Sequence, residues 1–277
     1  MTATLYIVGT PLGNLEDMTF RAVRILQTVD LIAAEDTRHT GKLLQHFQIK
    51  TPQVSYHDHN RHSRTIELVD RLQQGTSIAL VTDAGMPGIS DPGYELVKAC
   101  AEVGISVVPI PGATAAMTAL SASGLKCDRF VFEGFLPAKE TERREHLERL
   151  ITDDRTLIFY EAPHRVQKTL ADIATVLGDD RLIVLARELT KLHEEFWRGT
   201  VKAAIAHYTK HEPKGEFTLI VSGAEPTEVP LTEEVLKAEL LSLLKQGISR
   251  SQASRQLSQQ TALPRRQLYQ LALQIEL

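Results

Sequence analysis

The sequence predicts an α/β protein made of two α/β units in succession, followed by a small helical module. Short apolar runs rich in Val and Ile alternate with segments of helical periodicity, and this alternation starts again after Gly124. In the first unit the alternation favours a parallel sheet covered by helices on both faces. A polar segment with two prolines, 223–230, then precedes three further helical patterns, as is typical of a domain joint. We therefore expect units at 1–120, 121–225 and 231–277.

The elements of the first unit follow from two kinds of pattern. Apolar runs of four to six residues that end at turn residues predict strands, and segments whose apolar residues recur every three or four positions predict helices. The expected strands or extended segments are Leu5–Val8, Leu31–Ala34, Pro52–Tyr56, Ser77–Thr82 and Ser106–Ile110. The expected helices are Phe20–Val29, Thr40–Phe47, Ser63–Gln74, Pro92–Val103 and Ala113–Ala122.

The same patterns predict the second unit and the tail. The expected strands are Phe130–Phe132, Thr156–Tyr160, Leu182–Ala186, Glu195–Gly199 and Phe217–Val221, and the expected helices are Glu140–Ile151, Val166–Leu177 and Val201–His211. The dense charge of 140–149 predicts a solvated helix face. In the tail, helices are expected at Val235–Lys245, Gln252–Gln259 and Arg265–Leu273. Gly247, Ser249 and Pro264 supply the end signals, so the tail resembles a helix-turn-helix unit.

The composition excludes several classes of protein. With a net charge of −4, any binding to nucleic acid must depend on a local basic patch. No apolar run is long enough to span a membrane, and no secretory signal pattern is present. The two cysteines, Cys100 and Cys127, have the spacing of neither a disulfide framework nor a metal site. We expect a cytoplasmic protein without a membrane span and without a metal.

Three loops at strand ends predict a ligand site, because α/β sheets bind ligands at the carboxyl ends of their strands. The first, Gly9–Asp17, has two glycines but matches neither G-x-G-x-x-G nor a P-loop. The second, Val81–Gly93, has three glycines and two prolines and fixes backbone groups for a ligand. The third, Ile110–Ala116, has small residues that leave room for a flat ligand. For the first and third loops, an ordinary turn or close helix packing stays open.

Together the three loops resemble those of the tetrapyrrole-methylase superfamily of S-adenosylmethionine enzymes. The first loop is similar to the family's G-x-G-P-G-D element, with Leu12 in place of the family's proline. The second resembles the G-D-P loop and the third resembles the P-G-x-S/T segment. The resemblance implies a two-domain tetrapyrrole-methylase fold, also called the class III methyltransferase fold, with the methyl donor between the domains.

Further motifs resemble one branch, the ribosomal RNA small-subunit methyltransferase I group, over nearly the whole chain. These motifs are Ala34–Arg38, Thr82–Gly85, Ser90–Gly93, Phe132–Pro137, Tyr160–Arg165 and Arg187–Lys191. The resemblance implies methylation of the ribose 2′-oxygen of a decoding-region cytidine in 16S rRNA, with S-adenosylmethionine as donor. It also implies a substrate within the 30S subunit, a homodimer and no metal.

The resemblance also implies which residues contact the donor. Most of them belong to the three loops, and two come from the second unit. They are Leu12, Asp83, Ala84, Gly85, Met86, Pro87, Ile89, Thr114, Ala115, Glu161 and Leu189.

Two polar clusters that follow predicted strands are the expected catalytic residues, because a neutral 2′-hydroxyl is a poor nucleophile without a general base. They are Glu35, Asp36 and Arg38, and Glu161, His164 and Arg165. Asp36 could instead cap a helix, and Glu161 and Arg165 could form a structural ion pair. His57 and Glu133 are further candidates for the base, and Arg187 and Lys191 for holding phosphate. The sequence leaves the identity of the base open.

RNA binding is expected from the tail, which carries Arg250, Arg255, Arg265 and Arg266 on short helices. The alternative is that the tail only packs as a cap. Two competing functions stay open: a methylase of small tetrapyrroles with the same fold and donor, and a ligand-sensing helix-turn-helix regulator.

Overall fold

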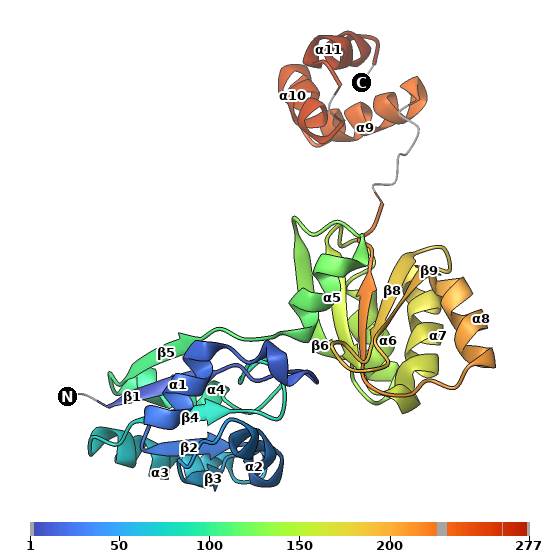
Figure 1. Ribbon diagram of the computed structural model, residues 1–277. Helices are drawn as coiled ribbons and strands as arrows, with labels where there is room; N and C mark the ends of the chain where they lie inside the picture. The colour runs from blue at the N-terminus through green and yellow to red at the C-terminus, as the bar shows by residue number, and fades with distance from the viewer. Residues whose placement is uncertain (1–2, 226–231, 262, 276–277) are drawn as a thin grey trace. The chain divides into compact units, whose positions relative to one another are not determined.

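The first sheet is parallel throughout in the computed structural model, which describes residues 3–225, 232–261 and 263–275 (Figure 1). Its strand order is β3-β2-β4-β1-β5. The strands are β1 (Thr4–Val8), β2 (Leu31–Ala34), β3 (Gln53–Ser55), β4 (Ile78–Val81) and β5 (Ser106–Ile110). The three inner strands, β2, β4 and β1, have nearly continuous apolar sequences, as expected for strands that are covered on both faces.

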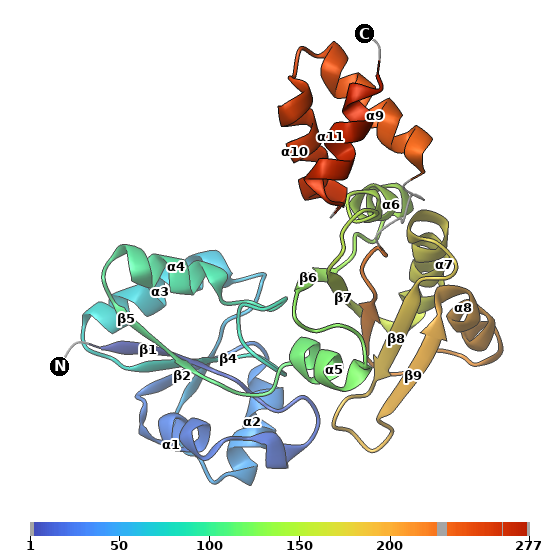
Figure 2. The same ribbon diagram turned by 90° about the horizontal axis from the view of Figure 1, so that it is seen from above.

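Helices cover both faces of this sheet, as the alternating pattern predicts. They are α1 (Phe20–Thr28), α2 (Thr37–His46), α3 (Arg61–Gln73) and α4 (Tyr94–Glu102). One apolar cluster joins Leu26 of α1 and Leu43 of α2 to the sheet, and another joins Leu68 of α3 and Leu96 of α4 to it. Figure 2 shows these two helical layers with the sheet between them.

The second sheet is mixed and has the order β6-β7-β10-β8-β9. Its strands are β6 (Phe130–Phe135), β7 (Thr156–Glu161), β8 (Leu182–Arg187), β9 (Glu195–Thr200) and β10 (Phe217–Val221). Strand β6 is parallel to β7, whereas β10 is antiparallel to both of its neighbours and β8 is antiparallel to β9. The connection between β8 and β9 is short, which permits an antiparallel pair but no parallel crossover.

The helices of the second sheet are unequally divided between its faces. They are α5 (Ala115–Ser123), α6 (Glu140–Glu148), α7 (Val166–Leu177) and α8 (Val201–Lys210). Helices α6, α7 and α8 share one apolar cluster, and α5 packs on the opposite face. The expected boundary between residues 120 and 121 lies within α5, a helix that joins the core of the second sheet through Ala119 and Leu120.

The chain divides into two compact units, Met1–Ala224 and the tail, Glu225–Leu277. The helices of the tail are α9 (Glu233–Lys245), α10 (Arg250–Thr261) and α11 (Arg265–Leu273). Leu240, Leu257 and Leu268, one from each helix, share its core. Residues 226–230 of the expected linker lie outside the described residues.

Most elements start or end within a few residues of their expected positions, and the differences have local causes. Helix α2 begins at Thr37 instead of Thr40 because the side chain of Asp36 caps it. Strand β6 continues to Phe135 through an irregularity between Phe132 and Gly134. Within the described residues, no helix is long and apolar enough to cross a membrane.

Candidate active site

The first two glycine-bearing loops are joined by backbone hydrogen bonds at the carboxyl end of the parallel sheet. The amide of Thr10 donates to the carbonyl of Gly85 at 2.9 Å, and the amide of Gly85 donates to the carbonyl of Thr10 at 3.1 Å. The hydroxyl of Thr10 donates to the carbonyl of Thr82 at 3.0 Å. Gly85 has φ of +80°, a conformation that favours glycine. The two loops therefore form one rigid unit.

The third loop approaches the first so closely that no side chain fits between them. A Cβ atom on Gly112 would lie 2.8 Å from the Cα of Gly9, and one on Gly9 would lie 2.7 Å from the Cα of Gly112. Both glycines are thus required by the approach of two backbones. The third loop then enters α5, whose first turn is capped by the hydroxyl of Thr114.

A cavity of about 280 Å³ lies against these loops, within the first unit, and is close to the lower end of the range usual for ligand sites. Its walls combine backbone of the glycine-bearing loops with apolar side chains and three carboxyl groups. It is lined by Leu12, Ala84, Gly85, Met86, Ile89, Ser90, Asp91, Thr114, Ala115, Phe135, Tyr160, Glu161, Ala162, Pro163, Glu216, Phe217 and Thr218.

Two of the three carboxyl groups already have partners. Glu161 is buried and pairs with Arg165 at 3.1 Å, and it also accepts hydrogen bonds from the Thr169 hydroxyl and the Ala162 amide. Glu216 is mostly exposed and pairs with Lys191 at 2.8 Å. Both carboxylates are therefore held by positive charge or by donors.

Asp91 is different, because none of its described neighbours forms an ion pair with it. Burial, together with the negative charges of Glu35, Asp83 and Asp58, raises the pKa of Asp91 to about 7. The hydroxyl of Thr82, which has no hydrogen-bond partner of good geometry among the described residues, lies near enough to favour the ionised form. The cavity thus holds one half-buried carboxyl that can change its charge near neutral pH.

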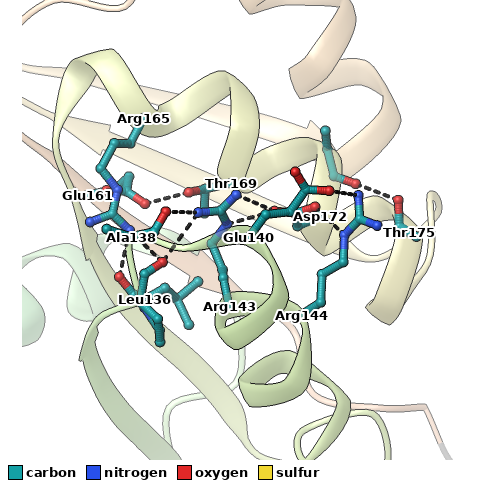
Figure 3. A network of polar contacts seen from close by, with 12 residues as sticks. Leu136, Ala138, Glu140, Arg143, Arg144, Glu161, Arg165, Thr169, Asp172 and Thr175 are labelled. Carbon is teal, nitrogen blue, oxygen red and sulfur yellow. Dashed lines mark hydrogen bonds and ion pairs between the residues drawn. The ribbon is translucent and has the colours of Figure 1, made fainter.

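A polar network fixes the loop that follows β6 (Figure 3). Arg165 donates to the carbonyl of Leu136 at 2.6 Å, and Arg143 donates to the carbonyl of Ala138 at 2.9 Å. Arg143 is buried and pairs with Asp172 at 2.6 Å, which also binds Arg144 at 2.7 Å. The expectation of a solvated face over 140–149 is therefore wrong at Arg143, because Asp172 of α7 compensates its buried charge.

Most residues expected to contact the donor line this cavity. They are Leu12, Ala84, Gly85, Met86, Ile89, Thr114, Ala115 and Glu161. Three do not: Asp83 lies at a neighbouring cavity, Pro87 is buried, and Leu189 belongs to the core between α5 and the second sheet. Donor contact itself stays a prediction for the whole set.

The expected catalytic residues are not brought to one place. Asp36 caps α2 by accepting from the Arg38 amide at 2.8 Å, and the Arg38 side chain binds the same carboxylate. Hydrogen bonds from Arg38 lower the pKa of Asp36. His164 is exposed and lies at a different surface hollow, beside Gln167 and Tyr208.

Of the two clusters, only Glu161 lines the cavity, with Arg165 as its partner. Glu35 is half-buried and accepts from the amide of Asp83 at 3.2 Å. Burial raises the pKa of Glu35, and the charges of Asp83 and Asp58 add to this effect. Of the other candidates, Glu133 binds His146 at 2.7 Å and Arg187 binds Glu195 at 3.0 Å.

The other residues of the cavity were not among the expected donor contacts; they are Ser90, Asp91, Phe135, Tyr160, Ala162, Pro163, Glu216, Phe217 and Thr218. Asp91 lies in a motif already noted for its resemblance, and that motif was the available signal. Phe217 and Thr218 are the first residues of β10, whose sequence predicts only a buried strand, so no sequence signal marks them as site residues. Tyr160 reaches the cavity from β7 and accepts from the amide of Ala116 at 3.2 Å.

A second cavity of about 570 Å³ shares Leu12, Ala84 and Glu216 with the first. It is lined by two lysines, Lys42 and Lys191, by His39, and by the carboxyl groups of Asp83 and Glu216. Lys191 crosses the first loop at Gly13, where an added Cβ atom would lie 2.3 Å from the lysine Cγ. The two cavities therefore differ in charge, the first acidic and the second with cationic groups.

The tail arginines differ in whether their side chains have partners within the tail. Arg250 donates to the carbonyls of Ala272 and Ile275 at 3.0 Å each, which completes the end of α11. Arg265 donates to the Ser251 hydroxyl at 2.8 Å. Arg255 and Arg266 are exposed, with no ion pair among the described residues.

Comparison with known proteins agrees with this architecture. Residues 4–205 match the model of the family described as Tetrapyrrole (Corrin/Porphyrin) Methylases. The chain is 64% identical over 273 residues to "Ribosomal RNA small subunit methyltransferase I" of Synechocystis sp., covering 98% of each chain. A protein of the same name from Escherichia coli O157:H7 is 49% identical, with 98% of this chain and 94% of that one covered. The chain belongs to the ribosomal RNA small subunit methyltransferase I family of tetrapyrrole methylases.

Two solved structures share the fold of this chain. Uroporphyrin-III-C-methyltransferase from Thermus thermophilus has a TM-score of 0.55 at 21% identity, covering 79% of this chain and 94% of that one. Diphthine synthase has a TM-score of 0.62 at 14% identity, with 80% and 90% covered. At these identities the likeness shows the fold alone, and it confirms the two-domain class III architecture.

S-adenosylmethionine is the methyl donor of this methylase family, and the first cavity fits it. None of the described residues that line the cavity is Lys, Arg or His, whereas three are carboxylic acids. This charge suits a ligand that carries a sulfonium and an ammonium group. Leu12, Met86 and Phe135 offer apolar surface for an adenine, and the glycine-bearing loops offer backbone groups.

Proposed function

We propose that this protein methylates the ribose 2′-oxygen of a cytidine in the decoding region of small-subunit rRNA. The observation that carries the proposal is the acidic, glycine-walled cavity in a chain that is 64% identical to a protein named "Ribosomal RNA small subunit methyltransferase I". The position and the nucleotide come from the family resemblance.

The three glycine-bearing loops would bind the methyl donor and align it for the reaction. S-adenosylmethionine, when bound, supplies an electrophilic methyl group on a good leaving group. Leu12, Ala84 and Thr114 would hold it, since they come from the three loops that hydrogen bonds and close backbone contact lock together. Rigid loops align the reacting atoms without further loss of entropy, which is a large part of such catalysis.

The second cavity would receive the target nucleotide. It adjoins the first through Leu12, Ala84 and Glu216, so a ribose there has access to the donor cavity. Lys42 and Lys191 can bind backbone phosphates, which position an RNA without reading its sequence. Because sequence-specific RNA recognition mostly uses unpaired nucleotides, we expect the cytidine to enter the cavity flipped out of its stack.

The tail would add RNA affinity through Arg255 and Arg266, whereas Arg250 and Arg265 have partners within the tail itself. We also propose that the protein acts in the cytoplasm, as a homodimer, on the assembled 30S subunit. Light scattering of the purified protein tests the dimer, and parallel assays with free 16S rRNA and with subunits test the substrate.

Labelled donor tests the reaction. Purified 30S subunits from cells that lack the protein should incorporate label at one cytidine, at a position resistant to alkaline cleavage, whereas uroporphyrinogen III should not be methylated. Ala84→Phe should abolish incorporation because the larger side chain fills the cavity. Ala101→Phe on the exposed side of α4 is the matched control and should retain activity. Methylation of the porphyrinogen and not of the subunits would reject the proposal.

A further inference from the structure

The ribose 2′-hydroxyl has to reach the first cavity from the second, and it loses a proton when it is methylated, so the first cavity needs a group that can receive this proton. Its described lining offers three carboxyl groups, Asp91, Glu161 and Glu216. Glu161 is held by Arg165, Thr169 and a backbone amide, so its charge is already compensated. Glu216 is exposed to solvent and held by Lys191. Asp91 alone among the three lacks a cationic partner within the described residues.

Asp91 is also held in place by a loop of restricted geometry. Ser90, directly before it, has φ of +62°, which is uncommon for a residue with a side chain. Gly93 has φ of +156°, and a Cβ atom there would lie 2.8 Å from the amide nitrogen of Gly88. Such strained backbone clusters at functional sites, where the surrounding structure has to maintain it. The loop thus directs an uncompensated carboxyl to the cavity wall.

We propose that Asp91 is the general base of this reaction and accepts the proton of the 2′-hydroxyl during methyl transfer. The proposal rests on the function proposed above. The ribose oxygen forms its bond to the methyl carbon while the bond from that carbon to sulfur breaks. The electron pair of the broken bond leaves with sulfur, and the hydroxyl proton passes to the Asp91 carboxylate. No other reactant is needed for this balance.

The surroundings of Asp91 match its proposed role. Glu35 after β2, Asp58 after β3 and Asp83 after β4 all place negative charge near it, and the Tyr160 ring lies on the side of the second sheet. Burial, with these charges, raises the pKa of Asp91 to about 7, and a base with a pKa near the working pH is the most effective. Arg165 and Lys191 do not relieve this charge, since both are paired with other carboxylates.

The test compares Asp91→Asn with Asp128→Asn in the full-length protein. Single-turnover methylation of 30S subunits is measured at saturating donor between about pH 5 and pH 9. Donor affinity is measured separately by calorimetry, and the carboxyl titration of Asp91 by carbon-13 NMR of the protein without substrate. The wild type must first methylate the subunits; if it does not, the proposed function fails and this assignment fails with it.

The wild-type rate should fall as the pH drops through about 7, and the NMR titration should have its midpoint there. Asp91→Asn should reduce the rate about 10²- to 10⁴-fold and remove this pH dependence, with donor affinity unchanged within about twofold. Asp128→Asn should keep the wild-type rate, because Asp128 is exposed and does not line the cavity. An unchanged rate in Asp91→Asn, or a loss of donor affinity equal to the loss of rate, would overturn the proposal.

Discussion

At the scale of single residues, glycine positions carry much of the information about the site. The sequence alone identifies the loops around Gly9, Gly85 and Gly112 as unusual, and the structure explains why two of these glycines accept no replacement. The backbones at Gly9 and Gly112 touch, although the two residues lie far apart in the chain. No sequence pattern predicts such a contact, since it depends on which strands are neighbours in the sheet.

A substitution at Gly9 should therefore disturb both stability and donor binding. Gly9→Ala should lower the free energy of unfolding by about 1–3 kcal/mol, because the added methyl overlaps the Gly112 backbone. Gly41→Ala is the control, since a Cβ atom there meets only a side-chain amide at 3.4 Å within a helix. Denaturant unfolding should show the control equal to the wild type or up to about 1 kcal/mol more stable. Equal stability of the two variants would contradict the contact.

The raised pKa of Asp91 should appear in the pH dependence of stability. Its folded pKa of about 7 lies above the unfolded value of about 4, so the folded protein binds the proton more tightly. The contribution of this group to stability is complete below about pH 4 and declines as the pH rises to about 7. Asp91→Asn, which cannot ionise, should thus be more stable than the wild type by about 1–2 kcal/mol at about pH 8, after allowance for solvent screening.

Unfolding in urea at about pH 4 and pH 8 measures this difference. The difference in unfolding free energy between Asp91→Asn and the wild type should disappear at the lower pH. Asp128→Asn, which alters an exposed carboxyl, is the control for a general effect of the lost charge. A gap that stayed the same at both pH values would show that Asp91 is ionised throughout.

At the scale of elements, periodicity predicted nearly every helix and strand. The charge pattern of 140–149, in contrast, gave a wrong prediction of solvent exposure at Arg143. Helix α6 reads as a solvated charged segment, yet Arg143 is buried against Asp172 of α7. A buried ion pair between two helices cannot be read from one helix, because the compensating charge lies elsewhere in the chain. The pairing of β10 between β7 and β8 likewise escapes a reading of local patterns, which report strands but not their neighbours.

Loss of Asp172 of α7 should destabilise the second sheet far more than loss of a surface pair at the start of α6. Asp172→Ala leaves Arg143 buried without a counter-charge and should cost about 3–5 kcal/mol in unfolding free energy. Lys139→Ala removes a solvent-exposed pair with Glu142 and should cost at most about 1 kcal/mol. Thermal unfolding followed by circular dichroism separates the two, and a similar effect of both would contradict the burial of the network.

At the scale of the whole molecule, the chain combines a catalytic unit with a small helical one. The proline-bearing polar segment before the tail separates two kinds of periodicity and led us to expect a distinct tail. The expected division into 1–120, 121–225 and 231–277 stays a prediction. The roles of the tail arginines were not predictable, since Arg250 is distinguishable from Arg255 only once their hydrogen bonds are known.

Removal of the free tail arginines should weaken RNA binding without affecting the donor. Arg255→Ala combined with Arg266→Ala should lower affinity for 30S subunits roughly tenfold. The slope of log affinity against log salt concentration should become shallower by about two, which corresponds to the loss of about two phosphate contacts. Lys237→Ala is the control, because that lysine is already paired with Glu233 at 2.6 Å. Filter binding at several salt concentrations measures the effect. Unchanged affinity in the double variant would indicate that the tail does not contact RNA.

The central position of β10 affects how the protein folds while it is being synthesised. This strand is the last of the sheet to be synthesised, and all five of its residues are buried between β7 and β8. Until it emerges from the ribosome, the nascent chain has two unpaired strand edges, which are templates for aggregation. A chain released shortly before Phe217 should therefore be insoluble, whereas one released after Ala224 should be recovered in soluble form.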